Sequence, residues 1–364
     1  MRRALICGAG VAGLGAALQL KQDGWQVRLF EREPELRTAG VGLNIWPNGV
    51  RVLQGLGLGE RFLAEAATMN RWWALDSDGA ITSDVDVSGW ARELGAPITG
   101  ARRRRLNALL ASGLTTEELA LGHHVERYEQ TDDGVTVHLA GGGTETGDLL
   151  LATDGIGSRL RNQMLGGPPV FTDEGYWRWR GVFACADAGV PTDVQADVYG
   201  PQGHFGWIPI DDTHAYWYGT LAGHTTLEEV TRTYGGWTRT PVPAIIAASQ
   251  PDSLIGREIA HYAEHLDRWV DGRVALIGDA AHPMYPGMAQ GANQALIDGE
   301  VLAACLRETP DVPAALRELE RRRTGPAHRM VEYSRLHFDF PTTRTQYASS
   351  GTNLQIERYL EAAS

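Results

Sequence analysis

A glycine-rich turn near the N-terminus constrains the fold of this chain more than any other feature. The stretch "CGAGVAGLG" places Gly8, Gly10 and Gly13 in the G-x-G-x-x-G spacing, directly after the apolar residues 3–7 and before a helical pattern. Residues 25–33, "WQVRLFERE", then have the composition of a second strand. A strand, a helix and a strand in this order predict a parallel sheet, because parallel strands need a long crossover connection.

Each glycine of this turn has its own physical reason. Gly8 permits a tight turn, Gly10 lets an anionic ligand approach the backbone, and Gly13 lets the helix pack closely on the strand. The N–H groups and the dipole at the helix start then face a phosphate. Glu31 ends the second strand, where a carboxylate accepts hydrogen bonds from ribose hydroxyls and repels a 2′-phosphate. The turn therefore predicts a site for FAD or NAD rather than NADP, and coincidental turn glycines are the alternative.

Two later stretches repeat the pattern of a buried strand that ends at an aspartate. Asp154 and Gly155 follow the apolar run in "LLLATDGIGSRLR", and Asp279 stands near the start of "GDAAHPMYPGMAQGANQALIDG". The second stretch leads into a helix near residues 288–291, whose start offers unpaired N–H groups and a positive dipole. Its small residues would let a flat, electron-rich ring lie against the backbone. The alternatives are an ordinary Asp-Gly turn at 154–155 and a plain Pro/Gly loop before the helix.

The region 170–265 has a different character. It is rich in Trp and Tyr, and segments such as "YWRWRGVFACAD" and "HAYWYGTLAG" alternate as antiparallel strands with one covered face do. The buried-strand pattern of the first region returns at "GRVALIGD", and long helices follow to the end. We expect breaks in these helices near Pro310, Pro326 and Pro341.

The pattern as a whole predicts an α/β fold: a Rossmann-like nucleotide-binding domain, a mostly antiparallel β-sheet substrate domain and C-terminal helices. The first domain is discontinuous and wraps around the second. Its predicted segments are 1–70, 98–168 and 268–364, and those of the substrate domain are 71–97 and 169–267.

Composition excludes several classes of protein. With 43% apolar and 21% charged residues the chain resembles a soluble globular protein, and a net charge of -12 argues against nucleic acid as a partner. No apolar run is long enough for stable membrane insertion. Cys7, Cys185 and Cys305 have neither disulfide nor metal-ligand spacing, which fits a reducing compartment without a metal site. We expect a cytoplasmic protein that is a monomer or a homodimer.

Together the three motifs resemble those of the FAD-dependent aromatic hydroxylases, the single-component flavoprotein monooxygenases of the p-hydroxybenzoate hydroxylase type. Within this family, the chain resembles the salicylate and 6-hydroxynicotinate hydroxylases. The likeness covers nearly the whole chain and includes "GVGLNIWPNGVRVLQGLGL" and "YWRWRGV". It implies a monooxygenase that uses FAD, O2 and transiently bound NADH or NADPH. Oxygen would pass from a flavin C4a-hydroperoxide to a small aromatic or heteroaromatic, phenol-like substrate.

The resemblance also implies roles for the cofactor-binding residues. One arginine of the run 102–105, best matched by Arg103, would touch the ribityl-phosphate region of FAD. Asp154, Gly155 and Arg161 are candidates for contact with NAD(P)H as well. The complete predicted set is Gly8, Gly10, Gly13 and Glu31 for the ADP half, Arg103, Asp154, Gly155 and Asp279 for the central part, and Pro286, Gly287, Met288, Ala289 and Gly291 for the isoalloxazine.

The substrate side is less determined. The aromatic segments suit a pocket for a flat ring, with Trp207, Tyr216, Tyr218 and Pro286 as candidate lining and plain core as the alternative for each aromatic. His204 is the first candidate for a catalytic base, because the ordinary pKa of histidine lies near working pH, and His214 and Tyr218 are the next candidate catalytic residues. Relatives often carry a histidine near the place of Trp207, so the identity of the base stays open.

Other reactions on the same fold also stay open. The stretch "HPMYPGMAQGAN" does not separate hydroxylation from epoxidation or Baeyer-Villiger oxygenation. A flavin reductase that needs no O2 and a non-catalytic dinucleotide-binding sensor are further alternatives.

Overall fold

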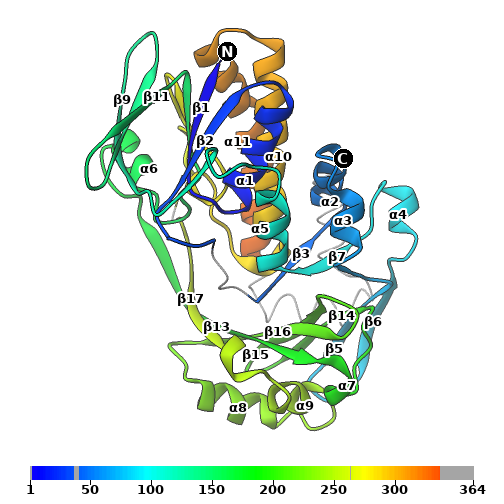
Figure 1. The fold of residues 1–364 in the computed structure, drawn as a ribbon. Coiled ribbons are helices and arrows are strands. Elements are labelled where there is room, and N and C mark those ends of the chain that lie inside the picture. The colour runs from blue at the N-terminus through cyan, green and yellow to red at the C-terminus, as the bar shows by residue number, and fades with distance from the viewer. Residues whose placement is uncertain (1, 37–40, 263, 337–364) are drawn as a thin grey trace.

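The computed structural model describes residues 2–36, 41–262 and 264–336 (Figure 1). The chain forms a nucleotide-binding part around a parallel sheet and a second part around a large, mostly antiparallel sheet. The predicted α/β class is therefore confirmed. The helix break predicted at Pro341 lies outside the described residues.

The first sheet has six strands in the order β18-β19-β12-β1-β2-β8. All neighbours pair in parallel except β18 and β19. Residues of β12 and most of β1 are fully buried, as expected for strands covered on both faces. The strands are β1 (Arg3–Cys7), β2 (Gln26–Glu31), β8 (Leu119–Leu121), β12 (Leu149–Ala152), β18 (Val270–Asp271) and β19 (Val274–Leu276).

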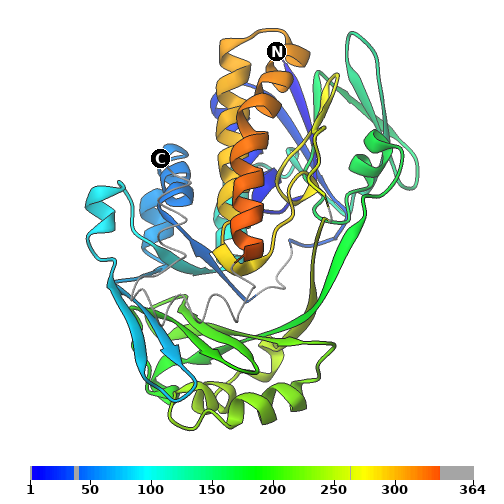
Figure 2. The same cartoon turned by 180° about the vertical axis from the view of Figure 1, so that it is seen from behind.

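Helix α1 packs directly on strands β1 and β2 of this sheet. α1 and α10 approach each other closely at Gly299, which has no side chain. A Cβ at this position would lie only 3.1 Å from the Cα of Ala16. Figure 2 shows α10 and α11 running side by side. The helices of this part are α1 (Val11–Gln22), α2 (Pro47–Gly55), α3 (Gly59–Leu63), α5 (Arg103–Ala111), α6 (Arg159–Leu165), α10 (Gly291–Glu308) and α11 (Val312–Leu336).

The prediction of a helix break at Pro326 is wrong, because α11 continues through this residue. A proline inside a helix costs about 3 kcal/mol, since it removes one hydrogen bond and crowds the preceding turn. Arg323, Ala327 and Met330 are buried on either side of the proline. Packing of this face against the core therefore outweighs the local cost. The break predicted at Pro310 is correct, since α10 ends before it and α11 begins after it.

Two three-stranded sheets flank the six-stranded one. β9, β10 and β11 form an antiparallel meander that packs against β1, where a Cβ at Gly147 of β11 would lie only 2.8 Å from Cγ of Leu5. β3, β7 and β4 lie between the two large sheets (Figure 1). The strands are β9 (Val125–Gln130), β10 (Val135–Leu139), β11 (Thr144–Gly147), β3 (Gly42–Ile45), β7 (Thr99–Arg102) and β4 (Ala67–Thr68).

The second large sheet has seven strands in the order β17-β13-β16-β15-β14-β5-β6. Only β14 and β5 pair in parallel. The strands are β5 (Arg71–Asp76), β6 (Ile81–Asp86), β13 (Phe171–Ala184), β14 (Val194–Gly200), β15 (Gly203–Pro209), β16 (His214–Ala222) and β17 (Ile255–Tyr262).

One face of this sheet is covered by α8 (Leu227–Gly235) and α9 (Val242–Ala247), and the other faces the nucleotide-binding part (Figure 1). The sequence did not predict these two helices. Two short helices, α4 (Trp90–Glu93) and α7 (Cys185–Ala188), lie at the ends of strands of this sheet.

The sheet membership supports a division of the chain that we propose as its domain organisation. β5, β6 and β13 to β17 share one sheet, whereas β18 and β19 belong to the other. We place the boundaries near residues 70, 98, 168 and 268, in the connections between the sheets.

Two further predictions concern the cysteines and the possibility of a membrane-spanning helix. Cys7, Cys185 and Cys305 are all buried free thiols. Among the described residues, no helix combines the length and the apolar character that crossing a membrane requires.

Candidate active site

A cavity of about 490 Å³ opens where β1, β2 and β12 end. These strands are neighbours in the parallel sheet, and ligands of doubly wound α/β folds bind at this edge. The cavity collects most of the residues that the sequence predicted for a dinucleotide. Those that line it are Gly8, Gly10, Glu31, Arg103, Asp154, Gly155, Asp279 and Gly291.

The three glycines of the N-terminal turn have different surroundings. Gly8 has a φ of +108°, and a Cβ there would lie 2.6 Å from the carbonyl oxygen of Thr153. A Cβ at Gly13 would overlap the carbonyl oxygen of Gly8, whereas a Cβ at Gly10 would meet nothing within 4 Å. Gly8 and Gly13 thus permit the close packing of β1, α1 and the end of β12. Gly10 leaves the backbone open toward the cavity.

The carboxylate of Glu31 is fixed at the end of β2. One oxygen accepts a hydrogen bond of 2.8 Å from the amide of Ala9, and the other accepts one of 3.1 Å from the amide of Glu33. Glu31 itself lines the cavity. A carboxylate held in this way suits the hydroxyl groups of a ribose, which donate hydrogen bonds.

Asp154 is the clearest sign that a ligand belongs here. Its Oδ2 accepts a hydrogen bond of 3.0 Å from the amide of Arg159. Its Oδ1 is buried and has no hydrogen-bond partner within the part of the chain that the structure describes. Burial raises the pKa of this carboxyl above its ordinary value. Because buried carboxylate oxygens are normally satisfied, the vacant one calls for a donor from a ligand, and the hydroxyls of FAD are such donors.

The stretch after β19 forms two short 3-10 turns before α10, η2 (Gly278–Ala280) and η3 (Pro286–Met288). Asp279 and Gly291 line the cavity, but the predicted residues Pro286, Gly287, Met288 and Ala289 do not. Met288 is instead buried in an apolar cluster beside the seven-stranded sheet. Ala289 has a φ of 52°, and no other non-glycine residue of the described segments has a positive φ. Such strain is frequent at ligand sites.

A buried charged cluster supports this stretch from behind. Asp298 of α10 bonds to Nε2 of His282 at 2.7 Å and to Nε of Arg323 at 2.7 Å. It also accepts a hydrogen bond from the amide of Gly278. Burial alone would raise the pKa of Asp298, but the charges of His282 and Arg323 hold it below its ordinary range. His282 is therefore structural, and Asp298 fixes the start of η2.

The seven-stranded sheet presents alternate residues to the two sides. Tyr216 and Tyr218 of β16 face the nucleotide-binding part, where Tyr216 packs so closely on Gly42 of β3 that a Cβ there would overlap its ring. Both tyrosines share an apolar cluster with Met288. The prediction that Trp207 lines the substrate pocket is wrong. Trp207 of β15 pairs with Trp217, which stands between Tyr216 and Tyr218 in β16 and therefore faces the opposite side of the sheet. There Trp207 is buried under α8 and α9.

Two of the predicted catalytic residues meet at a carboxylate that the sequence did not single out. Asp197 of β14 bonds to Nε2 of His204 at 2.8 Å and accepts hydrogen bonds from the hydroxyl of Tyr218 at 2.5 Å and from Nε1 of Trp72 at 2.8 Å. His204 is only 1% exposed and stacks on Tyr199 at 4.6 Å. His204 does not line the cavity: the alternation of β15 puts it on the same face as Tyr218, where Tyr199 and Tyr218 pack against its ring.

Two arginines of β13 lie on the same face. Nε of the buried Arg178 donates to Oγ1 of Thr220 at 2.8 Å, and its guanidinium lies 4.8 Å from the centre of the Tyr218 ring. Arg180 is half-buried. The alternation R-x-R in "YWRWRGV" is the signal that could have revealed both.

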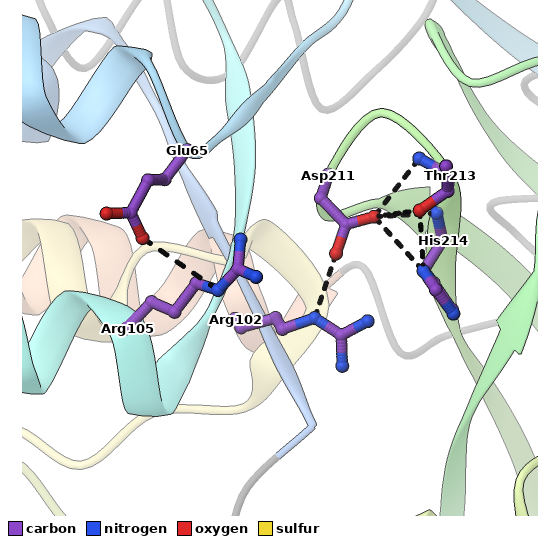
Figure 3. Close-up of polar contacts among 6 residues, drawn as sticks. All are labelled: Glu65, Arg102, Arg105, Asp211, Thr213 and His214. Atoms are coloured by element: carbon purple, nitrogen blue, oxygen red, sulfur yellow. Dashed lines mark hydrogen bonds and ion pairs between the residues drawn. The ribbon is translucent and has the colours of Figure 1, made fainter.

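An ion pair joins the two parts of the molecule beside the cavity (Figure 3). Arg102, at the end of β7, donates from Nε to Oδ2 of Asp211 at 2.9 Å, and Asp211 lies in the turn between β15 and β16. The other oxygen of Asp211 accepts from Thr213 and His214. Burial alone would raise the pKa of Asp211, but these bonds keep it well below its ordinary range. Since Arg103 lines the cavity, this pair fixes its position from the substrate side.

Known proteins with similar sequences share this architecture. Residues 2–334 match the family described as FAD binding domain. The chain is 35% identical over 335 residues to an aurachin C monooxygenase/isomerase of Stigmatella aurantiaca, covering 90% of this chain and 86% of that protein. It is 32% identical over 346 residues to an FAD-dependent urate hydroxylase of Klebsiella pneumoniae, covering 93% and 90%.

Solved structures give the same result. A structure of Klebsiella pneumoniae HpxO complexed with FAD and uric acid matches with a TM-score of 0.88 at 29% identity, covering 99% of this chain and 92% of that one. A tetrameric form of 2-methyl-3-hydroxypyridine-5-carboxylic acid oxygenase matches with a TM-score of 0.80 at 26% identity, covering 98% and 96%. The FAD predicted from the sequence is confirmed as the cofactor, and the chain belongs to the FAD-dependent monooxygenases of the aromatic hydroxylase family.

Proposed function

We propose that this monooxygenase hydroxylates a small, electron-rich heteroaromatic ring, with NADH or NADPH as electron donor and O2 as oxygen source. The chain aligns with proteins named for urate, 3-amino-4-hydroxybenzoate and 6-hydroxynicotinate over 93%, 93% and 84% of its length. All three compounds are small planar rings with polar substituents.

One structural observation carries this proposal: the cofactor cavity reaches the start of α10, three residues after the point where η3 packs against the aromatic face of the seven-stranded sheet. Gly291 lines the cavity, and Met288, just before it in the chain, is buried in one cluster with Tyr216 and Tyr218. A redox ring at the end of the cavity would therefore lie beside an apolar aromatic surface. That surface suits a flat substrate and excludes water, and water exclusion protects reactive oxygen chemistry.

The lining of the cavity supports a proposal for the groups that would hold FAD. Gly8, Gly10 and Glu31 would bind the ADP half, and the vacant oxygen of Asp154 would accept from a hydroxyl of the cofactor. When bound, FAD supplies a hydride acceptor for NAD(P)H and a centre that activates O2. The remaining proposed contacts are Arg103, Gly155, Asp279 and Gly291 along the cavity and Pro286 to Ala289 at the isoalloxazine.

On the substrate side, the pKa shifts of the two tyrosines favour a role as hydrogen-bond donors rather than as bases. Burial raises the pKa of Tyr216 to about 12 and that of Tyr218 well above its ordinary value, so both phenols stay protonated. Burial lowers the pKa of His204 below its ordinary value, which leaves the imidazole neutral. We infer that His204 positions Asp197 and Tyr218, and that Tyr216 and Tyr218 orient the ring.

Isotope labelling tests the proposal. The holoenzyme would be incubated with NADH or NADPH, 18O2 and a panel of hydroxypyridines, hydroxyquinolines and hydroxybenzoates, with NAD(P)H consumption, peroxide and product mass followed together. We expect at least one ring to accelerate NAD(P)H oxidation and to gain one 18O atom. If every ring that accelerates oxidation yields only peroxide, or gains its oxygen from water, aromatic hydroxylation is the wrong reaction.

A further inference from the structure

We propose that Asn107 is a cofactor-binding residue whose side-chain amide holds FAD where a sugar hydroxyl adjoins the pyrophosphate. Its Oδ1 accepts a hydrogen bond from the hydroxyl, and its Nδ2 donates one to a phosphate oxygen. The inference concerns the cofactor, so it does not depend on which ring the enzyme hydroxylates. It assigns a role to a residue outside the three motifs that identify the family.

Asn107 is an exception among the buried residues of α5. The other two, Leu106 and Leu110, belong to the large apolar cluster of the nucleotide-binding part. Asn107 is only 4% exposed. An asparagine is a weaker helix former than leucine, and it carries a polar amide into the interior. Packing alone would therefore favour an apolar residue at this position.

The amide oxygen of Asn107 lacks a partner in the protein. Oδ1 is buried and has no hydrogen-bond partner among the residues that the structure describes. Asn107 also lines the cavity at the ends of β1, β2 and β12. Of the described side chains with such a buried, unpartnered atom, only Asp154 also lines this cavity. Because buried polar atoms are normally satisfied, both oxygens call for donors from the same ligand.

Asn293 of α10 shows how a buried amide is satisfied when its role is structural. It is fully buried, its Oδ1 accepts from the amide of Trp46 at 3.0 Å, and its Nδ2 donates to the carbonyl oxygen of Ala289 at 2.9 Å. Asn293 does not line the cavity. Asn107 has the opposite combination, an open acceptor and a place in the cavity wall. The difference marks Asn107 as the amide available to a ligand.

The position of Asn107 on α5 indicates which part of FAD it meets. Asn107 follows Arg103 by four residues, so the two side chains are neighbours on the helix, and both line the cavity. The guanidinium of Arg103 suits a phosphate group. A carboxylate one turn away would repel that phosphate, whereas an amide is neutral and offers an acceptor and two donors. Since phosphate oxygens cannot donate, Oδ1 meets a hydroxyl and Nδ2 meets the phosphate.

Dilution of the holoenzyme, with released FAD followed by its fluorescence, tests the inference. Asn107→Leu keeps the approximate size of the side chain but removes both hydrogen bonds. Its Kd for FAD should rise about 10- to 100-fold, the range for losing a hydrogen bond to a charged group. Asn107→Asp keeps the acceptor but replaces the donor with a negative charge beside the pyrophosphate. Its Kd should also rise, and the rise should be smaller at high salt because salt screens the repulsion.

Thermal melting separates cofactor binding from folding. Stabilisation by a ligand depends on the ratio of its concentration to its Kd, so each holoenzyme is melted at the same multiple of its own Kd for FAD. Asn107→Leu should then melt at or above the wild-type temperature, because leucine removes a buried polar group from the interior. Gln19→Leu is the matched control. Gln19 is a buried amide of α1 outside the cavity, and its replacement should leave the Kd for FAD unchanged.

FAD analogues that lack one hydroxyl identify the sugar. One series lacks a hydroxyl of the ribitol chain, and the other lacks the 2′- or the 3′-hydroxyl of the ribose. The analogue without the bonded hydroxyl should bind the wild type about 2- to 10-fold more weakly than FAD, the range for one neutral hydrogen bond. That loss should disappear in Asn107→Leu, because two groups that contact each other are not additive in their effects.

Three results would overturn the inference. The first is an unchanged Kd for FAD in Asn107→Leu. The second is a melting temperature of this variant below that of the wild type at matched FAD, which would indicate a structural role. The third is a set of deoxy analogues that lose the same affinity with and without Asn107. Failure to hydroxylate any ring would overturn the proposed function alone, because neither FAD binding nor melting depends on turnover.

Discussion

The cofactor side of this site, around the cavity, and its substrate side, on the seven-stranded sheet, differ in the structural elements and residue types that form them. The cofactor side consists of turns at the ends of parallel strands, with Gly8, Gly10 and Asp154 around an open cavity. The substrate side consists of large side chains on a sheet face, where Tyr216, Tyr218 and buried charges fill the space. Backbone amides and small residues serve a cofactor that is common to the family. Interchangeable side chains on a fixed sheet can serve different substrates.

The largest effect is expected from the charged cluster that supports the cofactor side. Asp298→Asn leaves Arg323 buried without its charged partner, and such a loss costs about 3–5 kcal/mol. The free energy of unfolding, measured by urea denaturation, should fall accordingly. Glu318→Gln is the control, because its pairs with Arg321 and Arg322 are partly exposed to solvent and its removal should change the midpoint much less. Wild-type stability of Asp298→Asn would mean that the cofactor side does not depend on this cluster.

The second prediction separates packing from binding within one turn. A Cβ at Gly13 overlaps the Gly8 carbonyl, so Gly13→Ala should destabilise the fold by about 3 kcal/mol. Gly10→Ala meets open space, so the apoprotein should melt like the wild type while its Kd for FAD rises. Thermal melting and FAD titration of both variants measure the two effects. Equal destabilisation by both substitutions would show that Gly10 is not a ligand-facing position.

The third prediction concerns the contact between the two sides. The pair of Arg102 with Asp211 holds the pKa of Asp211 below the ordinary value of about 3.9. Its stabilising effect is therefore complete above that value and is lost as the pH falls through the lower folded-state pKa. Asp211→Asn should cost about 1–2 kcal/mol at neutral pH. The difference in melting temperature between variant and wild type should shrink at acidic pH. A difference that is constant with pH would exclude the ion pair as its cause.

The smallest effect is expected from the substrate side. His204→Ala should lower kcat by about tenfold, since it removes one hydrogen bond that positions Asp197, whereas FAD content stays unchanged. His204→Gln, which can still donate to Asp197, should restore part of the rate. The pH profile of kcat should keep its shape in both variants. Loss of one limb of that profile would instead identify His204 as the base.

The sequence predicted the cofactor side better than the substrate side for physical reasons. Few residues other than glycine can occupy positions 8 and 13, so their spacing was informative. The α/β class and a dinucleotide site followed from it, and FAD followed from the resemblance of the three motifs to the aromatic hydroxylases. On the substrate side, a shift of one residue in a strand reverses the direction of a side chain. Trp207 was therefore expected in the pocket but lies under α8 and α9.

Long-range pairing explains the other omissions. Asp197 receives bonds from three different strands. Asp298 joins Gly278 of η2, His282 and Arg323 of α11. No local pattern encodes either cluster. Arg180 was visible in the alternation of β13, but only the register with β16 shows that its neighbour is Tyr216. The domain boundaries and the roles of individual site residues stay predictions.

The flavin spectrum tests most directly whether the two sides form one site. A ring that the holoenzyme hydroxylates would be titrated into oxidised enzyme while the visible absorption of the flavin and the heat of binding are both recorded. We predict a saturable change in the flavin spectrum with the same Kd as calorimetry, because Met288 of the aromatic cluster stands only three residues before Gly291 of the cofactor cavity. A ring that binds by calorimetry and leaves the flavin spectrum unchanged would show that substrate and cofactor occupy separate places.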